Sequence, residues 1–124
     1  MDPHRKRILC AEDDNDTCSM IKSLLDLIGC EVVTVGNYAE ALDRINSDRF
    51  DLYLLDNWLP GGSGVQLCEK IRARDPEKPI LFYSGAAYPA DKQEAMEAGA
   101  NDYLIKPGEV GSLVETIKRL LAMT

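Results

Sequence analysis

Short, mostly apolar runs alternate along this chain with segments whose apolar residues recur at helical spacing. Five runs predict strands buried on both faces of a sheet: residues 8–11, 31–35, 52–55, 80–83 and 102–105. The intervening segments have apolar residues at i, i+3, i+4 and i+7, which is typical of an amphipathic helix. The first such set is Ile21, Leu24, Leu25 and Ile28.

Residues that favour helix ends mark where these helices begin and stop. Side chains that can cap a helix N-terminus are found at Asn15 or Asp16, at Asn37 and at Ser63. Gly29 and Gly99 follow the first and fourth helices as C-terminal glycines do. Pro76 ends the third helix at Asp75, and the fourth helix is expected over about residues 91–98.

Five strands alternating with five helices predict an α/β fold, a doubly wound parallel sheet with helices on both faces. Four of the strands end in polar residues, and only the second, which ends at Val35, does not. If the second strand lies at an edge, the other four carboxyl ends converge on one crevice, where ligands bind in such sheets. The polar residues at these ends are Glu12, Asp13, Asp56, Ser84 and Lys106.

Composition narrows the classes of protein that the chain can represent. Its 124 residues, 45% of them hydrophobic, predict a single domain over residues 1–124. The formal net charge of −7 argues against direct binding to nucleic acid or to anionic membranes. No apolar run approaches the roughly 20 residues of a membrane span. The basic segment at residues 1–7 does not begin a signal peptide, so a cytoplasmic protein is expected. The 4 cysteines lack CxxC spacing, so they are expected to be reduced thiols.

Three carboxylates, from Glu12, Asp13 and Asp56, would meet in the crevice. Like charges at close range destabilise one another unless a cation intervenes, and an all-oxygen set with spare water positions suits Mg²⁺. Each residue also has a simpler interpretation: residues 12–14 as a solvated turn, Lys106 as a counter-ion and Ser84 as a turn cap. Together they supply a carboxylate nucleophile, an acid pair, a hydroxyl and a cation, which is what phosphoryl transfer requires.

Four segments carry a resemblance to a known family. They are ILCAEDD at residues 8–14, LLDNWLPG at 54–61, YSGA at 83–86 and GANDYLIKP at 99–107. Each motif alone is weak, but the four in this order, each at a strand end, are specific. Over essentially its whole length the chain resembles the receiver domain of two-component response regulators.

The resemblance implies a flavodoxin-like (βα)5 sheet with strand order 2-1-3-4-5. It also implies that Asp56 accepts a phosphoryl group from the phosphohistidine of a sensor histidine kinase or a phosphotransfer protein. Mg²⁺, or Mn²⁺, would be bound by Asp13, Asp56 and the backbone carbonyl of Trp58, with Glu12 acting through water. Beyond phosphoryl uptake and slow autodephosphorylation, no turnover enzyme is implied.

The same resemblance implies how phosphorylation is sensed. Ser84 and Lys106 would bind the phosphoryl oxygens, while Ser84 and Tyr103 would form a switch in which the aromatic ring turns inward. Lys106-Pro107 resembles the family's cis peptide. The fourth helix, fifth strand and fifth helix would form a face that binds a downstream protein or an output domain, or that makes a homodimer. Its residues here include Tyr88, Met96, Glu97, Tyr103, Glu109 and Leu113.

The chain departs from the family pattern at three places. Asn57 stands where an apolar residue is commoner, and Trp58 stands where a smaller side chain is commoner. The indole is expected to lie over the crevice mouth and alter the lifetime of the phosphoryl group, or else to anchor a partner. Gly108 and Gly111 weaken the start of the last helix and predict a mobile joint.

Three other classes of function compete with a signalling module. An aspartyl phosphatase usually has a general acid two residues after its nucleophile, and Trp58 cannot transfer a proton. A flavodoxin cradles phosphate after its first strand, where the acids at residues 12–14 would repel it. A degenerate receiver that acts as an interaction scaffold without phosphorylation remains the alternative, although every required side chain is present. No histidine kinase core is found in this chain, and its lone histidine, His4, lies in a terminus that is expected to be mobile.

Overall fold

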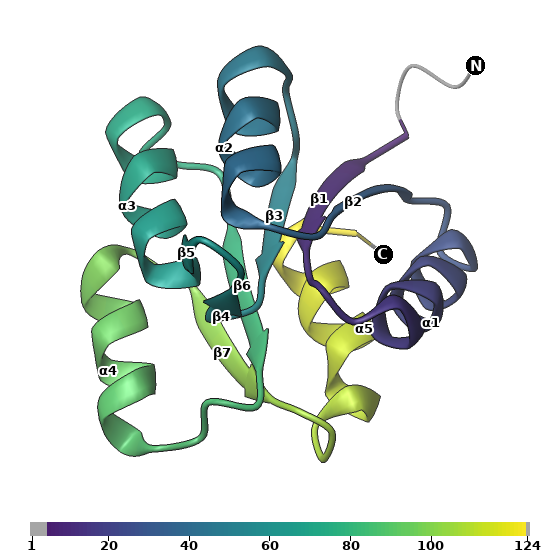
Figure 1. Cartoon of the computed structure of the whole chain (residues 1–124). Coiled ribbons are helices and arrows are strands. Elements are labelled where there is room, and N and C mark those ends of the chain that lie inside the picture. The colour runs from purple at the N-terminus through teal and green to yellow at the C-terminus, as the bar shows by residue number, and fades with distance from the viewer. Residues whose placement is uncertain (1–4, 124) are drawn as a thin grey trace.

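A five-stranded parallel sheet forms the centre of the molecule (Figure 1). The structure is a computed structural model that describes residues 5–123, so His4 lies outside the described residues. The strands of the sheet are β1 (Arg7–Ala11), β2 (Glu31–Val35), β3 (Leu52–Leu55), β6 (Ile80–Ser84) and β7 (Asp102–Ile105). They lie in the order β2-β1-β3-β6-β7. Counted along the chain this is 2-1-3-4-5 with the second strand at an edge, and the predicted fold class is confirmed.

Helices cover both faces of this sheet. In Figure 1, α2, α3 and α4 lie on one side of the strands, and α1 and α5 lie on the other. The helices are α1 (Asn15–Asp26), α2 (Tyr38–Ser47), α3 (Gly64–Arg74), α4 (Pro89–Ala98) and α5 (Val110–Leu120). The doubly wound arrangement is therefore the one expected from alternating strands and helices.

Alternate residues of the strands enter two separate hydrophobic cores. Ile8 and Leu54 pack in the core that α1 and α5 cover, while Leu9 and Leu55 pack in the core that α2, α3 and α4 cover. Because successive side chains of a strand point to opposite faces, a strand covered on both sides must be apolar throughout. In the strands β1, β3 and β6, polar residues are thereby confined to the ends, whereas the edge strand β2 has Thr34 in its interior.

The helix ends agree with the sequence at most positions. Asn37 caps α2, and Ser63 caps α3 in a capping box with Gln66. The prediction of Asn15 or Asp16 as the cap of α1 is wrong: Asp14, which has an extended backbone, accepts a hydrogen bond from the Thr17 amide at 2.9 Å. The first helix therefore begins directly after the third of the three acids that follow β1.

A small hairpin was not expected from the sequence. Its strands, β4 (Trp58–Leu59) and β5 (Gly62–Ser63), pair antiparallel in the connection after β3. Gly61 turns the chain with φ of +87°, a conformation that favours glycine. Strands of two residues are too short to produce a periodic pattern in the sequence.

Two residues assigned to the exposed face of α4, β7 and α5 are not on the surface. Leu113 is 0% exposed and Tyr103 is 3% exposed, because both side chains point into the cores. Tyr88 and Met96 are exposed, as expected. Within residues 5–123 there is no helix that is both long and apolar enough to cross a membrane.

Candidate functional site

Backbone hydrogen bonds hold the polar strand ends next to one another. Beyond the last paired residues, the Glu12 amide donates to the Val35 carbonyl at 2.9 Å and the Asp56 amide donates to the Ala11 carbonyl at 3.0 Å. Lys106 is placed in the same way, since its amide donates to the Ser84 carbonyl at 3.0 Å. The ladders of the sheet thus carry the predicted site residues to one edge of it.

The Asp56 carboxylate lies at the centre of this group. Ser84 Oγ donates to Asp56 Oδ1 at 2.8 Å, and Lys106 Nζ lies 3.0 Å from Asp56 Oδ2. The backbone nitrogen of Trp58 donates to Oδ1 at 3.2 Å. Asp56 is only 6% exposed, so these three donors replace the water that a buried carboxylate has lost.

Lys106 joins the two buried acids. Its Nζ lies 2.6 Å from Glu12 Oε1 as well as beside Asp56. Burial alone would lower the pKa of Lys106, but the hydrogen bonds to Glu12 and Asp56 outweigh it and raise that pKa. Burial raises the pKa of Glu12, although Lys106 and the Asp14 amide oppose the rise. One cation therefore does not fully compensate the acids around it.

The acid group has the ligand chemistry of a divalent cation site. Glu12, Asp13 and Asp56 each offer a carboxylate oxygen, and these oxygens lie within 4.8 Å of one another. Asp13 is exposed, which leaves that side of the group open to water. Hard oxygen ligands with adjacent water positions suit Mg²⁺, so the residues present fit the ion.

Ser84 is bonded to the Asp56 carboxylate, and Tyr103 is bonded to the loop that follows Ser84. Ser84 is 0% exposed, and its Oγ also accepts from the Asn57 amide at 3.3 Å and from the Ala86 amide at 3.2 Å. The Tyr103 hydroxyl donates to the Ala86 carbonyl at 2.6 Å, and burial raises its pKa. The ring already points inward and stacks on Phe82 at 5.4 Å between centroids.

Two residues that shape the site were not among the predicted site residues. The Asn57 side chain accepts from the Val65 amide at 3.4 Å and so ties the acceptor loop to α3. A Cβ on Gly64 would lie 2.5 Å from the Asp56 carbonyl oxygen and 2.8 Å from the Phe82 ring. Asn57 could have been identified as a polar residue in an apolar position, whereas Gly64 gave no signal beyond lying next to a cap.

Trp58 lies at the rim of the site. Trp58 is 62% exposed. Its ring carbon Cζ3 would lie 3.8 Å from a Cβ added to Gly85. Gly85 follows Ser84 directly, so the indole leans toward the loop after β6. The Lys106-Pro107 bond is cis, as the resemblance implied.

A family model matches most of this chain. The model describes the response regulator receiver domain and covers residues 8–118. The chain belongs to this family. Receiver domains are signalling domains of two-component systems, and the predicted recognition is therefore confirmed.

Relatives of this receiver domain are longer regulators. The transcriptional regulatory protein PrrA of Mycobacterium tuberculosis is 36% identical over 115 residues, which are 93% of this chain and 49% of PrrA. The DNA-binding response regulator MtrA of Mycolicibacterium smegmatis is 34% identical over 98% of this chain and 53% of MtrA. The receiver domain thus spans about half the length of the curated relatives it matches.

A solved structure shares the fold over nearly the whole receiver domain. The CheY-like receiver domain protein of Methanospirillum hungatei superposes with a TM-score of 0.89 at 32% identity, over 95% of this chain and 94% of that one. Both the strand order and the helix layers therefore belong to a known architecture.

Proposed function

We propose that this receiver domain accepts a phosphoryl group on Asp56 from the phosphohistidine of a sensor histidine kinase or a phosphotransfer protein. The observation that carries the proposal is the Asp56 carboxylate, held between Ser84 Oγ at 2.8 Å and Lys106 Nζ at 3.0 Å. An Asp56 oxygen attacks phosphorus, the bond from phosphorus to the donor atom breaks, and an acyl phosphate forms. The donor leaves with the electron pair of the broken bond.

Mg²⁺, or Mn²⁺, would be held by Asp13, Asp56 and the backbone carbonyl of Trp58, with Glu12 acting through water. Support comes from the three carboxylate oxygens within 4.8 Å. A divalent ion there supplies charge neutralisation for the phosphoryl oxygens. A structural neighbour supports this choice of ion, since the receiver domain of sensor histidine kinase PA1611 from Pseudomonas aeruginosa has magnesium coordinated in its active site cleft; its TM-score is 0.85 at 28% identity, over 95% of this chain and 98% of that one.

Ser84 and Lys106 would bind the oxygens of the new phosphoryl group. Both side chains now contact Asp56, so a group esterified to Asp56 comes within their reach. Lys106 pairs with the new charge, which is roughly two negative units at neutral pH. Ser84 and Tyr103 would then carry the change outward, because the loop of Ala86 is bonded to both hydroxyls.

The face formed by α4, β7 and α5 would present this change to a downstream protein or an output domain, or would form a homodimer. Exposed Tyr88, Met96 and Glu97 are the residues available on it. The acidic domain itself would not bind DNA, would act in the cytoplasm and would catalyse only its own phosphoryl uptake and slow hydrolysis.

Labelling with acetyl phosphate in Mg²⁺, followed by intact mass, tests this proposal. We expect one phosphoryl group on the native chain and none on Asp56→Asn, because an amide oxygen is a far weaker nucleophile. Asp51→Asn, at the other end of β3, is the matched control and should label normally. Undiminished labelling of Asp56→Asn would exclude Asp56 as the acceptor.

A further inference from the structure

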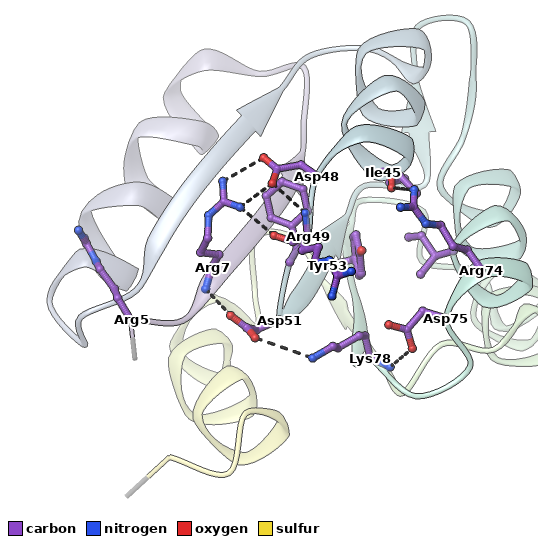
Figure 2. A pocket seen from close by; sticks show the side chains of 12 residues that line it. Arg5, Arg7, Ile45, Asp48, Arg49, Asp51, Tyr53, Arg74, Asp75 and Lys78 are labelled. Atoms are coloured by element: carbon purple, nitrogen blue, oxygen red, sulfur yellow. Dashed lines mark hydrogen bonds and ion pairs between the residues drawn. The ribbon is translucent and has the colours of Figure 1, made fainter. Parts of the chain in front are cut away.

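A pocket of about 500 Å³ lies at the amino ends of the strands, at the other end of the sheet from Asp56 (Figure 2). Small-molecule sites typically measure roughly 300–1,000 Å³. Residues from the start of β1, the α2–β3 connection and the end of α3 line it. In Figure 2 the Tyr53 ring lies in the middle of these side chains, between Arg7 and Arg74.

Cations are concentrated around this pocket although the chain as a whole is acidic. The chain has 14 lysines and arginines and a net charge of −7, and five of those cations line the pocket: Arg5, Arg7, Arg49, Arg74 and Lys78. A cleft lined mainly by one sign of charge raises the local concentration of the opposite ion. The pocket is therefore a place where an anion would gather.

The acids of the pocket are already occupied by other partners. Asp48 accepts two hydrogen bonds from Arg7, at 2.8 and 3.1 Å. Asp51 accepts from the Arg7 amide at 2.8 Å and lies 3.9 Å from Lys78. Asp75 accepts from two amides of the following turn, at 2.9 and 3.1 Å. These carboxylates are held by backbone and by Arg7, and so they do not neutralise the other arginines.

Two arginines and one hydroxyl are left without such partners. Arg49 and Arg74 form no ion pair with any residue in the range 5–123. Among these residues, the Arg74 side chain donates a hydrogen bond only to the Ile45 carbonyl. The Tyr53 hydroxyl makes no hydrogen bond within the same described range; because no buried side-chain oxygen or nitrogen there lacks a partner, this hydroxyl is an accessible atom of a residue that is only 6% exposed. Uncommitted donors thus surround the centre of the pocket.

An apolar floor lies beneath these donors. Ile45, Phe50 and Ile71 are each at most 3% exposed and line the pocket with Tyr53. The rings of Phe50 and Tyr53 meet edge to face at 5.9 Å. Sites that bind small organic anions combine such apolar walls with a few placed polar groups, and guanidinium groups match phosphate and carboxylate geometry.

We propose that this pocket binds a small organic anion, with a phosphate or carboxylate held by Arg49 and Arg74 and an aromatic body beside the Tyr53 ring, since the Arg7 guanidinium already covers the Phe50 ring at 4.9 Å. The proposal does not depend on phosphorylation of Asp56, because the pocket lies at the opposite strand ends. It gives the domain a second input of a different chemical kind.

Phenyl phosphate, titrated into the isotope-labelled chain and followed by amide chemical shifts, tests the proposal. Saturable shifts at residues 45, 50 and 53 are expected, together with weaker binding of inorganic phosphate and of benzyl alcohol, each of which offers only part of the ligand. Benzoate, compared with phenyl phosphate, distinguishes a carboxylate site from a phosphate site. Asp56→Asn should bind phenyl phosphate as the native chain does, so failure of this proposal and failure of the phosphoryl-acceptor proposal remain distinguishable.

Single substitutions locate the binding contacts. Arg49→Gln should weaken phenyl phosphate about tenfold, because it removes a charge-assisted hydrogen bond. Tyr53→Phe, which keeps the ring, should weaken it about fivefold. Lys92→Gln, which removes the same charge from the exposed surface of α4, is the control and should change nothing. Shifts that do not saturate, or that persist in both Arg49→Gln and Tyr53→Phe, would overturn the proposal. So would shifts that a glutamate-rich peptide produces and phenyl phosphate does not.

Discussion

Both ends of the sheet gather charged side chains, but the carboxyl end buries an excess of acids, whereas the amino end keeps its excess of cations exposed to water. At the carboxyl end, three carboxylates within 4.8 Å of one another share one lysine, and Glu12 and Asp56 are at most 6% exposed. At the amino end, Arg7 is bonded to Glu31 at 2.7 Å and to Asp48 at 2.8 Å, and all three side chains are 30 to 40% exposed. The Arg7 cluster thus pairs its charges in contact with water, whereas the carboxyl end buries an excess of acids.

The pKa directions express the same difference. Arg7 holds the pKa of Asp48 down at about 2, so the charged form is favoured in the folded chain. Burial raises the pKa of Glu12, so its charged form is disfavoured there. A fold that keeps disfavoured charge in its interior is poised for a further cation or a reaction, whereas paired exposed charge contributes modestly to stability.

The largest effect on stability should come from removing the lysine at the carboxyl end of the sheet. Lys106→Ala leaves Glu12 and Asp56 buried without their cation, and in the absence of divalent ions it should lower the free energy of unfolding by about 3 kcal/mol. It should also uncouple phosphorylation from partner affinity. Urea unfolding measures the first effect, with Lys92→Ala as the exposed control. An unchanged stability would mean that the acids are compensated by something other than Lys106.

Magnesium should act on the carboxyl end alone. An ion that binds only the folded chain stabilises it by about 2.7 kcal/mol at a concentration 100 times the dissociation constant. Asp13→Asn should remove most of this stabilisation, while Glu69→Gln, an exposed acid on α3, should leave it intact. Thermal unfolding with and without Mg²⁺ gives the comparison. Equal gains in both variants would place the ion elsewhere.

In the Arg7 cluster, the stability contributed by Asp48 should depend on pH. Because the folded pKa of Asp48 is depressed from 3.8 to about 2, its contribution is present above pH 3.8 and is lost as the pH falls toward 2. Asp48→Asn should therefore cost about 1 kcal/mol at neutral pH, and the deficit should shrink on acidification. Asp43→Asn, an exposed acid on α2, is the control. A deficit that stays constant with pH would rule out the pairing with Arg7 as its source.

The smallest effect is kinetic and concerns Trp58. If the indole at the rim of the site restricts the approach of water, Trp58→Ala should shorten the lifetime of the phosphoryl group several-fold without changing stability. Leu27→Ala, which also truncates an exposed apolar residue, is the control. Equal dephosphorylation rates of the native chain and Trp58→Ala would end this interpretation.

The carboxyl end was predictable because its residues follow strands. Apolar runs locate the strands, and the ladder hydrogen bonds then bring Glu12, Asp56 and Lys106 together. Asp14 was not recognised as a cap because three acids in a row follow β1 and their backbone angles decide which one acts. The need for Gly64 could not be predicted because it arises from Phe82, a residue far along the chain.

The amino-end pocket could not be predicted from local patterns. Its cations come from segments separated in sequence, and Arg7, Arg49 and Arg74 follow no common spacing. Whether each arginine is paired depends on rotamers and on the turns that carry Asp48 and Asp75. Such information appears only when the connections at this end of the sheet are placed in space.

The hydroxyl of Ser84 has no unused hydrogen-bond donor or acceptor. A serine hydroxyl offers one proton and two lone pairs, and here the proton goes to Asp56 while Asn57 and Ala86 amides occupy the lone pairs. Any rotation of this side chain must break several hydrogen bonds at once, to residues that follow β3 and to a residue that follows β6. Substitution by alanine would leave the Asn57 and Ala86 amides without this acceptor and would leave Asp56 Oδ1 with only the Trp58 amide as donor.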